Sequence, residues 1–195
     1  MLFYILIVLI SALLIMGANI LSGVDFVQAM SGVLGGISIV FLLDLIIAAV
    51  IMILPKKLFN PFSKKFRTYA WEKKFYMYLR IKSWKDLIPK GNGIFGFGLR
   101  KDRVENPNST EYLMSFLIEN CRAETMHVIS AHVGFLIVLF FSLENLSISL
   151  PIACVNFVLQ VLPVMVQRYL RPKLICAYKR AERSKEMLNI QNGLN

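Results

Sequence analysis

Four ionisable residues within nine positions have types and spacings that suit acid–base chemistry. They are Glu119, Arg122, Glu124 and His127, and they lie in a stretch that reads as one continuous helix. Glu124 and His127 are three residues apart, so they are neighbours on one helix face. A carboxylate beside an imidazole fixes the tautomer of the ring and raises its basicity, as a general base that acts on a hydroxyl requires. We therefore assign His127 as the candidate base and Glu124 as its orienting partner.

The same residues admit two other interpretations. Two glutamates and a histidine are ligand types for a divalent metal, and Glu119 with Arg122 could form a structural ion pair. The helix that carries them is expected over Glu111–Val133, with Ser109 or Thr110 as its cap, and it runs into an apolar stretch. Ionisable residues near membrane depth are costly and are candidates for function by default. We assign the cluster to catalysis, and we assign no metal and no cofactor.

A second polar group follows the last apolar run and could hold an anion. Gln167, Arg168 and Arg171 concentrate donors there, and an arginine binds carboxylates and phosphates in a planar fork. We assign all three to binding of an anionic headgroup or a carrier phosphate, while ordinary anchoring at the membrane interface remains an equal alternative.

Within that last apolar run, Asn156 and Gln160 lie one turn apart on one face. We assign Asn156 to substrate binding with the arginines. Asp44 in an earlier apolar run could partner one of these polar groups, but a single carboxylate is a weak signal.

The elements that position these residues are apolar runs. The chain has 195 residues, of which 56% are hydrophobic and 17% charged, and its formal net charge is +10. Spans are expected at 1–22, 33–55, 127–143 and 148–167, close to the roughly 20 residues that cross a bilayer. Residues 1–22 lack a basic start and form too long an apolar run for a cleaved signal, so we read them as a retained anchor.

The charges give these spans one orientation. All 22 Lys and Arg fall in the segments 56–126 and 168–195, and none lies elsewhere. By the positive-inside rule, both of these segments and both termini are cytoplasmic. The sequence thus predicts an all-α integral membrane protein, a single domain over 1–195, with about four transmembrane helices in the cell membrane. Four buried helices of a soluble bundle would leave the segregation of charge unexplained.

The segment 56–126 is expected to lie partly in the membrane interface. Aromatic residues alternate there with Lys and Arg, an arrangement that suits either nucleic-acid stacking or a lipid headgroup layer. The neighbouring spans favour anionic lipid headgroups as partners and no nucleic acid. The glycine-rich stretch 91–98 contains the letters of a dinucleotide-binding fingerprint, but no strand precedes it and no amphipathic helix follows. We expect a flexible or lipid-facing loop there.

Three stretches resemble a known family: IKSWKDLIP at 81–89, LIENCRAETMHVIS at 117–130 and VLPVMVQRYLRPKL at 161–174. Their order and spacing over roughly residues 75–175 resemble the glycosyl-4,4'-diaponeurosporenoate acyltransferases of bacterial carotenoid biosynthesis. The matching positions are Lys82, Trp84, Lys85, Glu119, Arg122, Ala123, Glu124, His127, Pro163, Gln167, Arg168, Tyr169, Arg171, Pro172 and Leu174. Val128 and Leu170 depart from the Trp and Asn of the family pattern.

This resemblance implies transfer of a fatty acyl chain to a sugar hydroxyl of a glycosylated carotenoid at the membrane. The implied partners are an acyl donor and a membrane lipid or glycolipid substrate. Arg122 or Arg168 would stabilise the oxyanion or hold the donor, and Trp84 joins the substrate-binding set. Neither an HxxxxD motif nor a GxSxG elbow occurs in the chain. Two alternatives are another lipid-directed transferase, such as a methyltransferase, and a non-enzymatic lipid-binding membrane protein.

Overall fold

The structure is a computed structural model that describes residues 2–88, 106–140 and 146–193, without the side chains of residues 140 and 192. It separates into two compact units. Unit 1 takes in residues 1–54, 87–89 and 125–164, and unit 2 takes in 55–86, 90–124 and 165–195. All regular structure in the described ranges is helical, as predicted. The glycine-rich stretch 91–98 lies outside the described residues.

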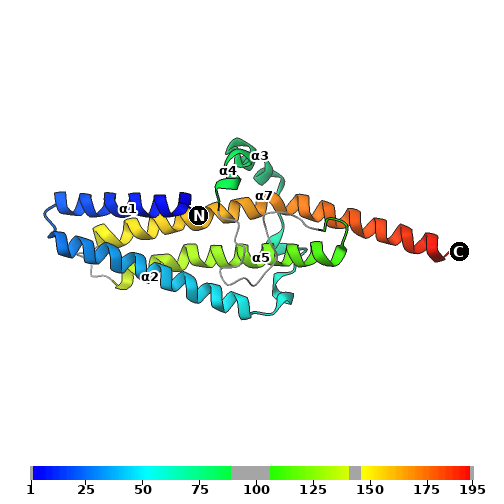
Figure 1. The fold of residues 1–195 in the computed structure, drawn as a ribbon, viewed down its shortest axis with the longest axis horizontal. Coiled ribbons are helices and arrows are strands. Elements are labelled where there is room, and N and C mark those ends of the chain that lie inside the picture. The colour runs from blue at the N-terminus through cyan, green and yellow to red at the C-terminus, as the bar shows by residue number, and fades with distance from the viewer. Residues whose placement is uncertain (1, 89–105, 141–145, 194–195) are drawn as a thin grey trace. The chain divides into compact units, whose positions relative to one another are not determined.

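Unit 1 begins with a hairpin of two apolar helices, α1 (Leu2–Leu21) and α2 (Phe26–Ile53), which run antiparallel (Figure 1). Gly23 in the connecting turn has φ +92°, a conformation that glycine adopts without strain. The carboxylate of Asp25 accepts hydrogen bonds from the backbone N–H groups of Val27 and Gln28 and so caps α2. These local signals fix where the chain reverses.

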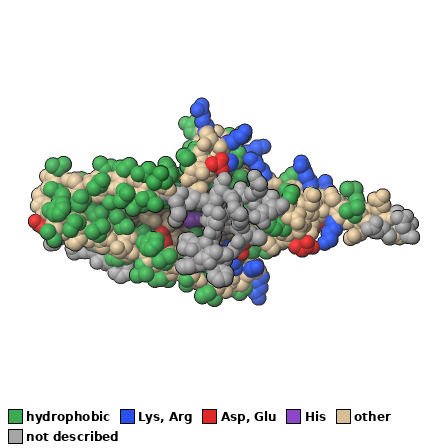
Figure 2. Space-filling view, in the orientation of Figure 1, with side chains coloured by type: hydrophobic (Ala, Val, Ile, Leu, Met, Phe, Trp, Pro, Cys, Tyr) green, Lys and Arg blue, Asp and Glu red, His purple; other side chains and the backbone are tan. Residues whose placement is uncertain are grey.

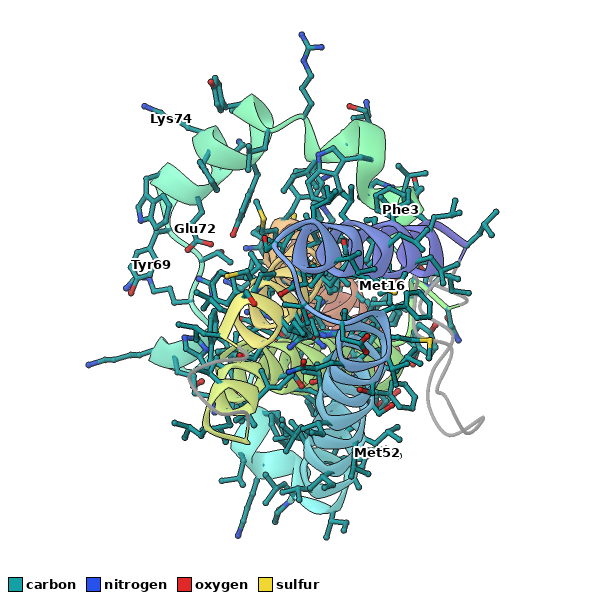
Figure 3. All side chains as sticks on the ribbon, turned by 90° about the vertical axis from the view of Figure 1, so that its left-hand side faces the viewer. Phe3, Met16, Met52, Tyr69, Glu72 and Lys74 are labelled. Carbon is teal, nitrogen blue, oxygen red and sulfur yellow. The ribbon has the colours of Figure 1, made fainter. Side chains whose placement is uncertain are left out.

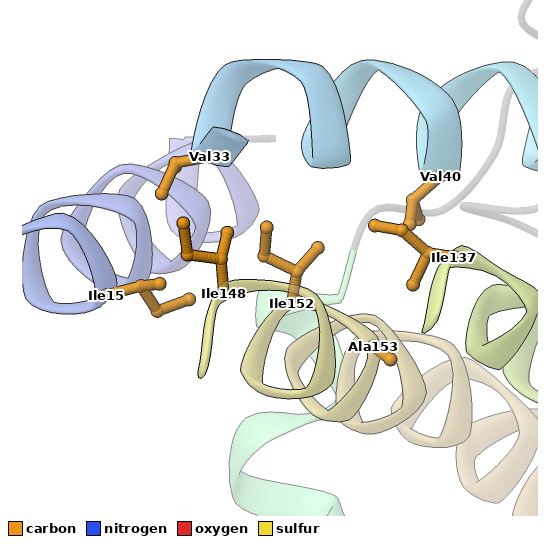
Figure 4. Close-up of a cluster of buried hydrophobic side chains, with 7 residues drawn as sticks. All are labelled: Ile15, Val33, Val40, Ile137, Ile148, Ile152 and Ala153. Carbon is orange, nitrogen blue, oxygen red and sulfur yellow. The ribbon is translucent and has the colours of Figure 1, made fainter. Parts of the chain in front are cut away.

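The rest of unit 1 consists of the end of α5 (Thr110–Val133), the 3₁₀ turn η4 (Gly134–Leu136), α6 (Ile137–Phe140) and the first part of α7 (Leu146–Gly193). Ser109 Oγ accepts from the N–H of Tyr112, so the predicted cap of α5 is confirmed. One apolar cluster joins the elements (Figure 4): Ile15, Val33, Val40, Ile137, Ile148, Ile152 and Ala153.

Gly32 allows α2 and α7 to approach closely, because a Cβ there would lie 2.9 Å from Ile148 Cδ1. Small residues at helix contacts are the usual means of tight packing in lipid.

Three helices are long and apolar enough to cross a membrane among the described residues: α1, α2 and the Leu146–Gln191 part of α7. They correspond to the spans expected at 1–22, 33–55 and 148–167. The stretch expected as a further span at 127–143 is divided between α5, η4 and α6, and residues 141–145 lie outside the described ranges. The α-helix gives way to the 3₁₀ turn at Gly134, a residue of low helix propensity that packs against Asn156.

The outer surface of unit 1 is apolar. Figure 2 shows hydrophobic side chains crowded over α1 and α2. Leu13 and Phe41, each 63% exposed, are two of many such side chains. A contiguous apolar surface of this kind marks contact with lipid or with a partner protein. Because α1 and α2 are each long enough to cross a bilayer, lipid is the favoured contact.

Unit 2 is built from short helical elements, the start of α5 and the end of α7. The short elements are η1 (Lys56–Phe59), η2 (Lys64–Phe66), α3 (Ala70–Tyr78), α4 (Ile81–Trp84) and η3 (Lys85–Leu87). Phe59, Phe66 and Ile81 are almost fully buried and anchor them. Every described Lys and Arg belongs to unit 2. Charge and hydrophobicity are therefore divided between the two units.

Candidate active site

In unit 1, hydrogen bonds link a series of polar side chains that ends at His127. Gln160 of α7 lies at its centre: Gln160 Oε1 is 2.6 Å from His127 Nδ1, and Gln160 Nε2 donates to Asp44 Oδ2 at 2.5 Å. We call Asp44, Gln160 and His127 the amide relay. Asn156, one turn before Gln160, donates to the backbone oxygen of Ser130 and is buried. The predicted pairing of Asp44 with a polar group of the last span is thus confirmed.

The amide relay determines which ring nitrogen of His127 carries a proton. Gln160 presents its NH₂ group to Asp44 Oδ2 and its carbonyl oxygen to His127 Nδ1. A carbonyl oxygen only accepts, so the hydrogen of a neutral imidazole lies on Nδ1. The lone pair is then on Nε2, so Nε2 is the basic nitrogen of the ring.

An apolar pocket of about 290 Å³ adjoins the amide relay in unit 1. Side chains of α1, α2 and α7 line it, and most of them are aliphatic or aromatic. Asp44, Asn156 and Gln160 are among its polar lining residues. The pocket therefore combines an apolar wall with a few hydrogen-bonding groups, as small-molecule sites do.

Unit 2 holds a separate buried cluster of two arginines and two carboxylates. We call Arg168, Arg171, Glu72, Glu124 and Asn120 the arginine cluster. Arg168 donates to Glu72 through Nε and Nη2, and to Glu124 Oε1 through Nη1 at 2.7 Å. Its Nη2 also donates to the backbone oxygen of Arg67. The guanidinium of Arg168 thus joins α3, α5 and α7.

Arg171 is more deeply buried, with 0% of its surface exposed. It donates to Asn120 Oδ1 through Nε and Nη2, to the backbone oxygen of Phe66 through Nη1, and to Glu124 Oε2 through Nη2. Its guanidinium also lies 5.3 Å from the centre of the Phe66 ring. A buried arginine whose three nitrogens all have protein acceptors holds helices together.

Glu72 of α3 is the residue of the arginine cluster that sequence reasoning missed. Figure 3 shows it near the start of α3, with Lys74 extending away from it. Burial opposes its ionisation, but hydrogen bonds from Arg168, the N–H of Tyr69 and the hydroxyl of Tyr76 hold the pKa of Glu72 below its ordinary value. Burial together with Glu72 raises the pKa of Tyr76 to about 12. Only the tertiary fold brings this carboxylate to Arg168, 96 residues away.

The remaining predicted residues lie in unit 2. Arg122 donates to Glu119 at 2.9 Å, and its guanidinium lies 5.3 Å from the centre of the Phe59 ring. Trp84 Nε1 donates to the backbone oxygen of Leu79 and so ties α4 to the end of α3. Gln167 Oε1 is buried, with no hydrogen-bond partner among the described residues.

Glu124 and His127 are three residues apart on α5, but their described contacts differ. Both carboxylate oxygens of Glu124 accept from arginines, and His127 Nδ1 pairs with Gln160. Within the amide relay, Gln160 and Asp44 were not among the site residues assigned from the sequence. The lone charge in the 33–55 run and the one-turn spacing of Asn156 and Gln160 were the signals that pointed to them.

Comparison with known families supports the resemblance drawn from the three motifs. The family model of glycosyl-4,4'-diaponeurosporenoate acyltransferase, CrtO, matches residues 55–180. No curated protein and no solved structure matches the chain. The family model covers α3, α5 and most of α7, including every assigned site residue. Because this match extends over more than half of the sequence, the chain belongs to the glycosyl-4,4'-diaponeurosporenoate acyltransferase family.

Proposed function

We propose that this protein is a multi-pass membrane acyltransferase that moves a fatty acyl chain to a sugar hydroxyl of a glycosylated carotenoid or related glycolipid, with His127 as general base. Membership of an acyltransferase family supports the reaction class. The observation that carries the residue assignment is the hydrogen bond between His127 Nδ1 and Gln160, which leaves Nε2 as the basic nitrogen.

In the proposed reaction, His127 Nε2 takes the proton of the sugar hydroxyl as its oxygen attacks the acyl carbonyl. A C–O bond forms and the carbonyl oxygen becomes an oxyanion. When the tetrahedral intermediate collapses, the bond to the donor's leaving group breaks, and the imidazolium returns its proton to that group. Gln160 and Asp44 keep the ring in one tautomer and stabilise its charged form.

The arginine cluster has a structural role in this proposal. Its guanidinium groups are largely occupied by Glu72, Glu124, Asn120 and backbone oxygens. It would therefore hold α3, α5 and α7 in place, and α5 and α7 carry His127 and Gln160. Arg122, which is 14% exposed and bonded to Glu119, keeps its assignment as a candidate partner of the donor.

For the membrane arrangement we propose four spans, with residues 127–143 as the third, and with 56–126 and both termini on the cytoplasmic side. The confinement of Lys and Arg to unit 2 supports this orientation. Unit 2 also has a pocket of about 420 Å³ lined by Lys64, Arg67 and Lys179, which suits the anionic lipid headgroups expected as partners.

The test is acylation of a glycosylated carotenoid carboxylic acid by membranes that contain the protein, followed by mass spectrometry of the pigment. We expect a gain of one fatty acyl unit. His127→Ala should lower the rate by roughly 10²–10⁴-fold, the usual contribution of a general base. Asp44→Asn should cost less, about 10–100-fold, as is typical for residues that orient another group.

His132→Ala is the matched control, because His132 is exposed, hydrogen-bonds the backbone oxygen of Val128 on its own helix and otherwise meets only the edge of the Phe157 ring among the described contacts. It should keep the wild-type rate. Full activity of a correctly inserted His127→Ala variant would disprove the base assignment. A wild-type protein that adds no acyl chain, but methylates or merely binds the lipid, would disprove the proposed reaction.

A further inference from the structure

The lining of the apolar pocket in unit 1 changes from polar to apolar along the length of the pocket. Tyr4 of α1 donates to the backbone oxygen of Leu159, next to Gln160, and so marks the end of the pocket at the amide relay. Ile15 and Ile152, which also line it, belong to the apolar core cluster and mark the other end. Eleven residues of α1 separate Tyr4 from Ile15, a rise of roughly 16 Å. The pocket is thus elongated, polar at one end and apolar at the other.

We propose that this pocket binds the fatty acyl chain of the donor, with the acyl carbonyl at the Gln160 end and the chain extending toward Ile15. This inference rests on the proposed function, and it adds a location for one of the two substrates. A saturated chain has the same polarity gradient as the pocket. His127 hydrogen-bonds to Gln160, so the carbonyl end of such a chain lies beside the base.

The size of the pocket favours the acyl chain over the glycosylated carotenoid. Its volume of about 290 Å³ is at the lower limit of small-molecule pockets, which run from roughly 300 to 1,000 Å³. A polyene that carries a sugar is far bulkier than a single alkyl chain. The walls come from α1 and α2 as well as α7, and α1 and α2 precede the 55–180 region matched by the family model.

In this proposal, the side chains near the Ile15 end determine how long an acyl chain the pocket accepts. Ala12 lines the pocket one turn before Ile15, and its small side chain leaves the apolar end accessible. Its neighbour Leu13 is 63% exposed on the outer face of α1 and is not a lining residue. These two adjacent positions therefore separate an effect inside the pocket from a general effect on α1.

The experiment offers an equimolar mixture of saturated acyl donors of graded length and measures the ester products by mass spectrometry. Ala12→Leu should shift the product profile toward shorter chains and lower kcat/KM for the longest accepted donor by at least about tenfold, within the usual worth of one misfitting methylene. Leu13→Phe should leave the profile unchanged. Ile37→Ala, which enlarges the pocket from α2, should shift the profile toward longer chains.

An active Ala12→Leu variant with the wild-type profile would overturn the inference, and the pocket would then hold bulk lipid. If Ala12→Leu does not fold, Ile37→Ala provides the test, and an active Ile37→Ala variant with the wild-type product profile would overturn the inference. A photoreactive diazirine fatty acid gives a readout without turnover: it should crosslink to α1 and α7 in the wild type and less in Ala12→Leu. Crosslinking without transfer would uphold the pocket and disprove only the proposed function, whereas transfer without crosslinking at α1 or α7 would disprove the pocket.

Discussion

At the scale of single residues, the charges of the arginine cluster pair with one another and so hold parts of the fold together. Arg171 is entirely buried, and Glu124, Asn120 and a backbone oxygen accept hydrogen bonds from its guanidinium group. Removing one partner of such a pair leaves the other buried without compensation. This is why Arg171, which we assigned from the sequence to anion binding with interfacial anchoring as an equal alternative, has its clearest consequence in stability.

We predict that Arg171→Met destabilises the protein by about 3–5 kcal/mol, the usual cost of breaking a buried ion pair. The measurement is equilibrium unfolding of the detergent-solubilised protein. Lys173→Met, two residues further along α7, is the control, because Lys173 is exposed and contacts only Tyr169 in the described structure. Equal stability of the two variants would contradict the structural role of Arg171.

Glu72 gives a prediction for pH. Its pKa is held below the ordinary 4.5 of a glutamate, so the folded state favours the ionised form. The stabilisation is complete above that value and is lost as the pH falls toward the lowered pKa of the folded state. The thermal midpoint of the wild type should therefore decline on acidification below about pH 4.5, and less so in Glu72→Gln. Glu186→Gln, at an exposed carboxylate of α7, should leave the shape of the curve unchanged, and a similar flattening there would argue against Glu72 as the source.

At the scale of elements, the contact between η4 and α7 supports the amide relay. A Cβ on Gly134 would collide with the side chain of Asn156, whose Nδ2 donates to the backbone oxygen of Ser130. Asn156 Oδ1 in turn lies 3.5 Å from Gln160 Nε2. The absence of a side chain at position 134 thus preserves the position of two amide groups.

Gly134→Ala should destabilise the protein by about 1–3 kcal/mol, the usual cost of overpacking, and should lower acyl transfer as well. Gly35→Ala on α2 is the matched control, because nothing lies within 4 Å of the Cβ it would add. That change should be neutral or slightly stabilising, since alanine is the better helix former. Thermal unfolding and pigment acylation of the two variants make the comparison, and a harmless Gly134→Ala would contradict the packing argument.

The sequence predicted elements better than it predicted contacts. Long apolar runs made α1 and α2 predictable, and the Ser109 cap marked the start of α5. The unbroken length of α7 was not predicted, since the expected span ended at residue 167 and Pro172 lies inside the helix, where a helix boundary is the usual expectation. The pairing of Glu72 with Arg168 was also missed, because helical periodicity relates only residues a few positions apart. The assignments of His127, Glu119 and Arg122 to catalysis stay predictions.

At the scale of the whole molecule, the net charge of +10 and the 56% hydrophobic content describe different parts of the chain. The described residues of unit 1 carry Asp25 and Asp44 and no Lys or Arg, whereas unit 2 holds all the described basic residues. At 1.5 Å per residue, the 48 residues of α7 extend over about 72 Å, more than twice the thickness of a bilayer core. The helix is therefore much longer than a single crossing of a bilayer core requires.

The proposed orientation gives a prediction for labelling. In a background without Cys121, Cys154 and Cys176, Ser22→Cys in the turn after α1 should react with a membrane-impermeant maleimide in intact cells. Ser184→Cys, exposed near the end of α7, should react only after the membrane is permeabilised. The reverse pattern would invert the topology and would place unit 2 on the outer side.

The long sequence separations in the arginine cluster also govern how the protein is made. Glu72 leaves the ribosome 96 residues before Arg168, and Glu124 leaves it 47 residues before Arg171. At about 5–20 residues per second, Glu72 waits roughly 5–20 s for its partner. During that interval unit 2 has acquired its carboxylates but not the guanidinium groups that allow their burial. A nascent chain that stalls before Arg168 would therefore hold Glu72 and Glu124 without the guanidinium groups that pair with them in the folded protein.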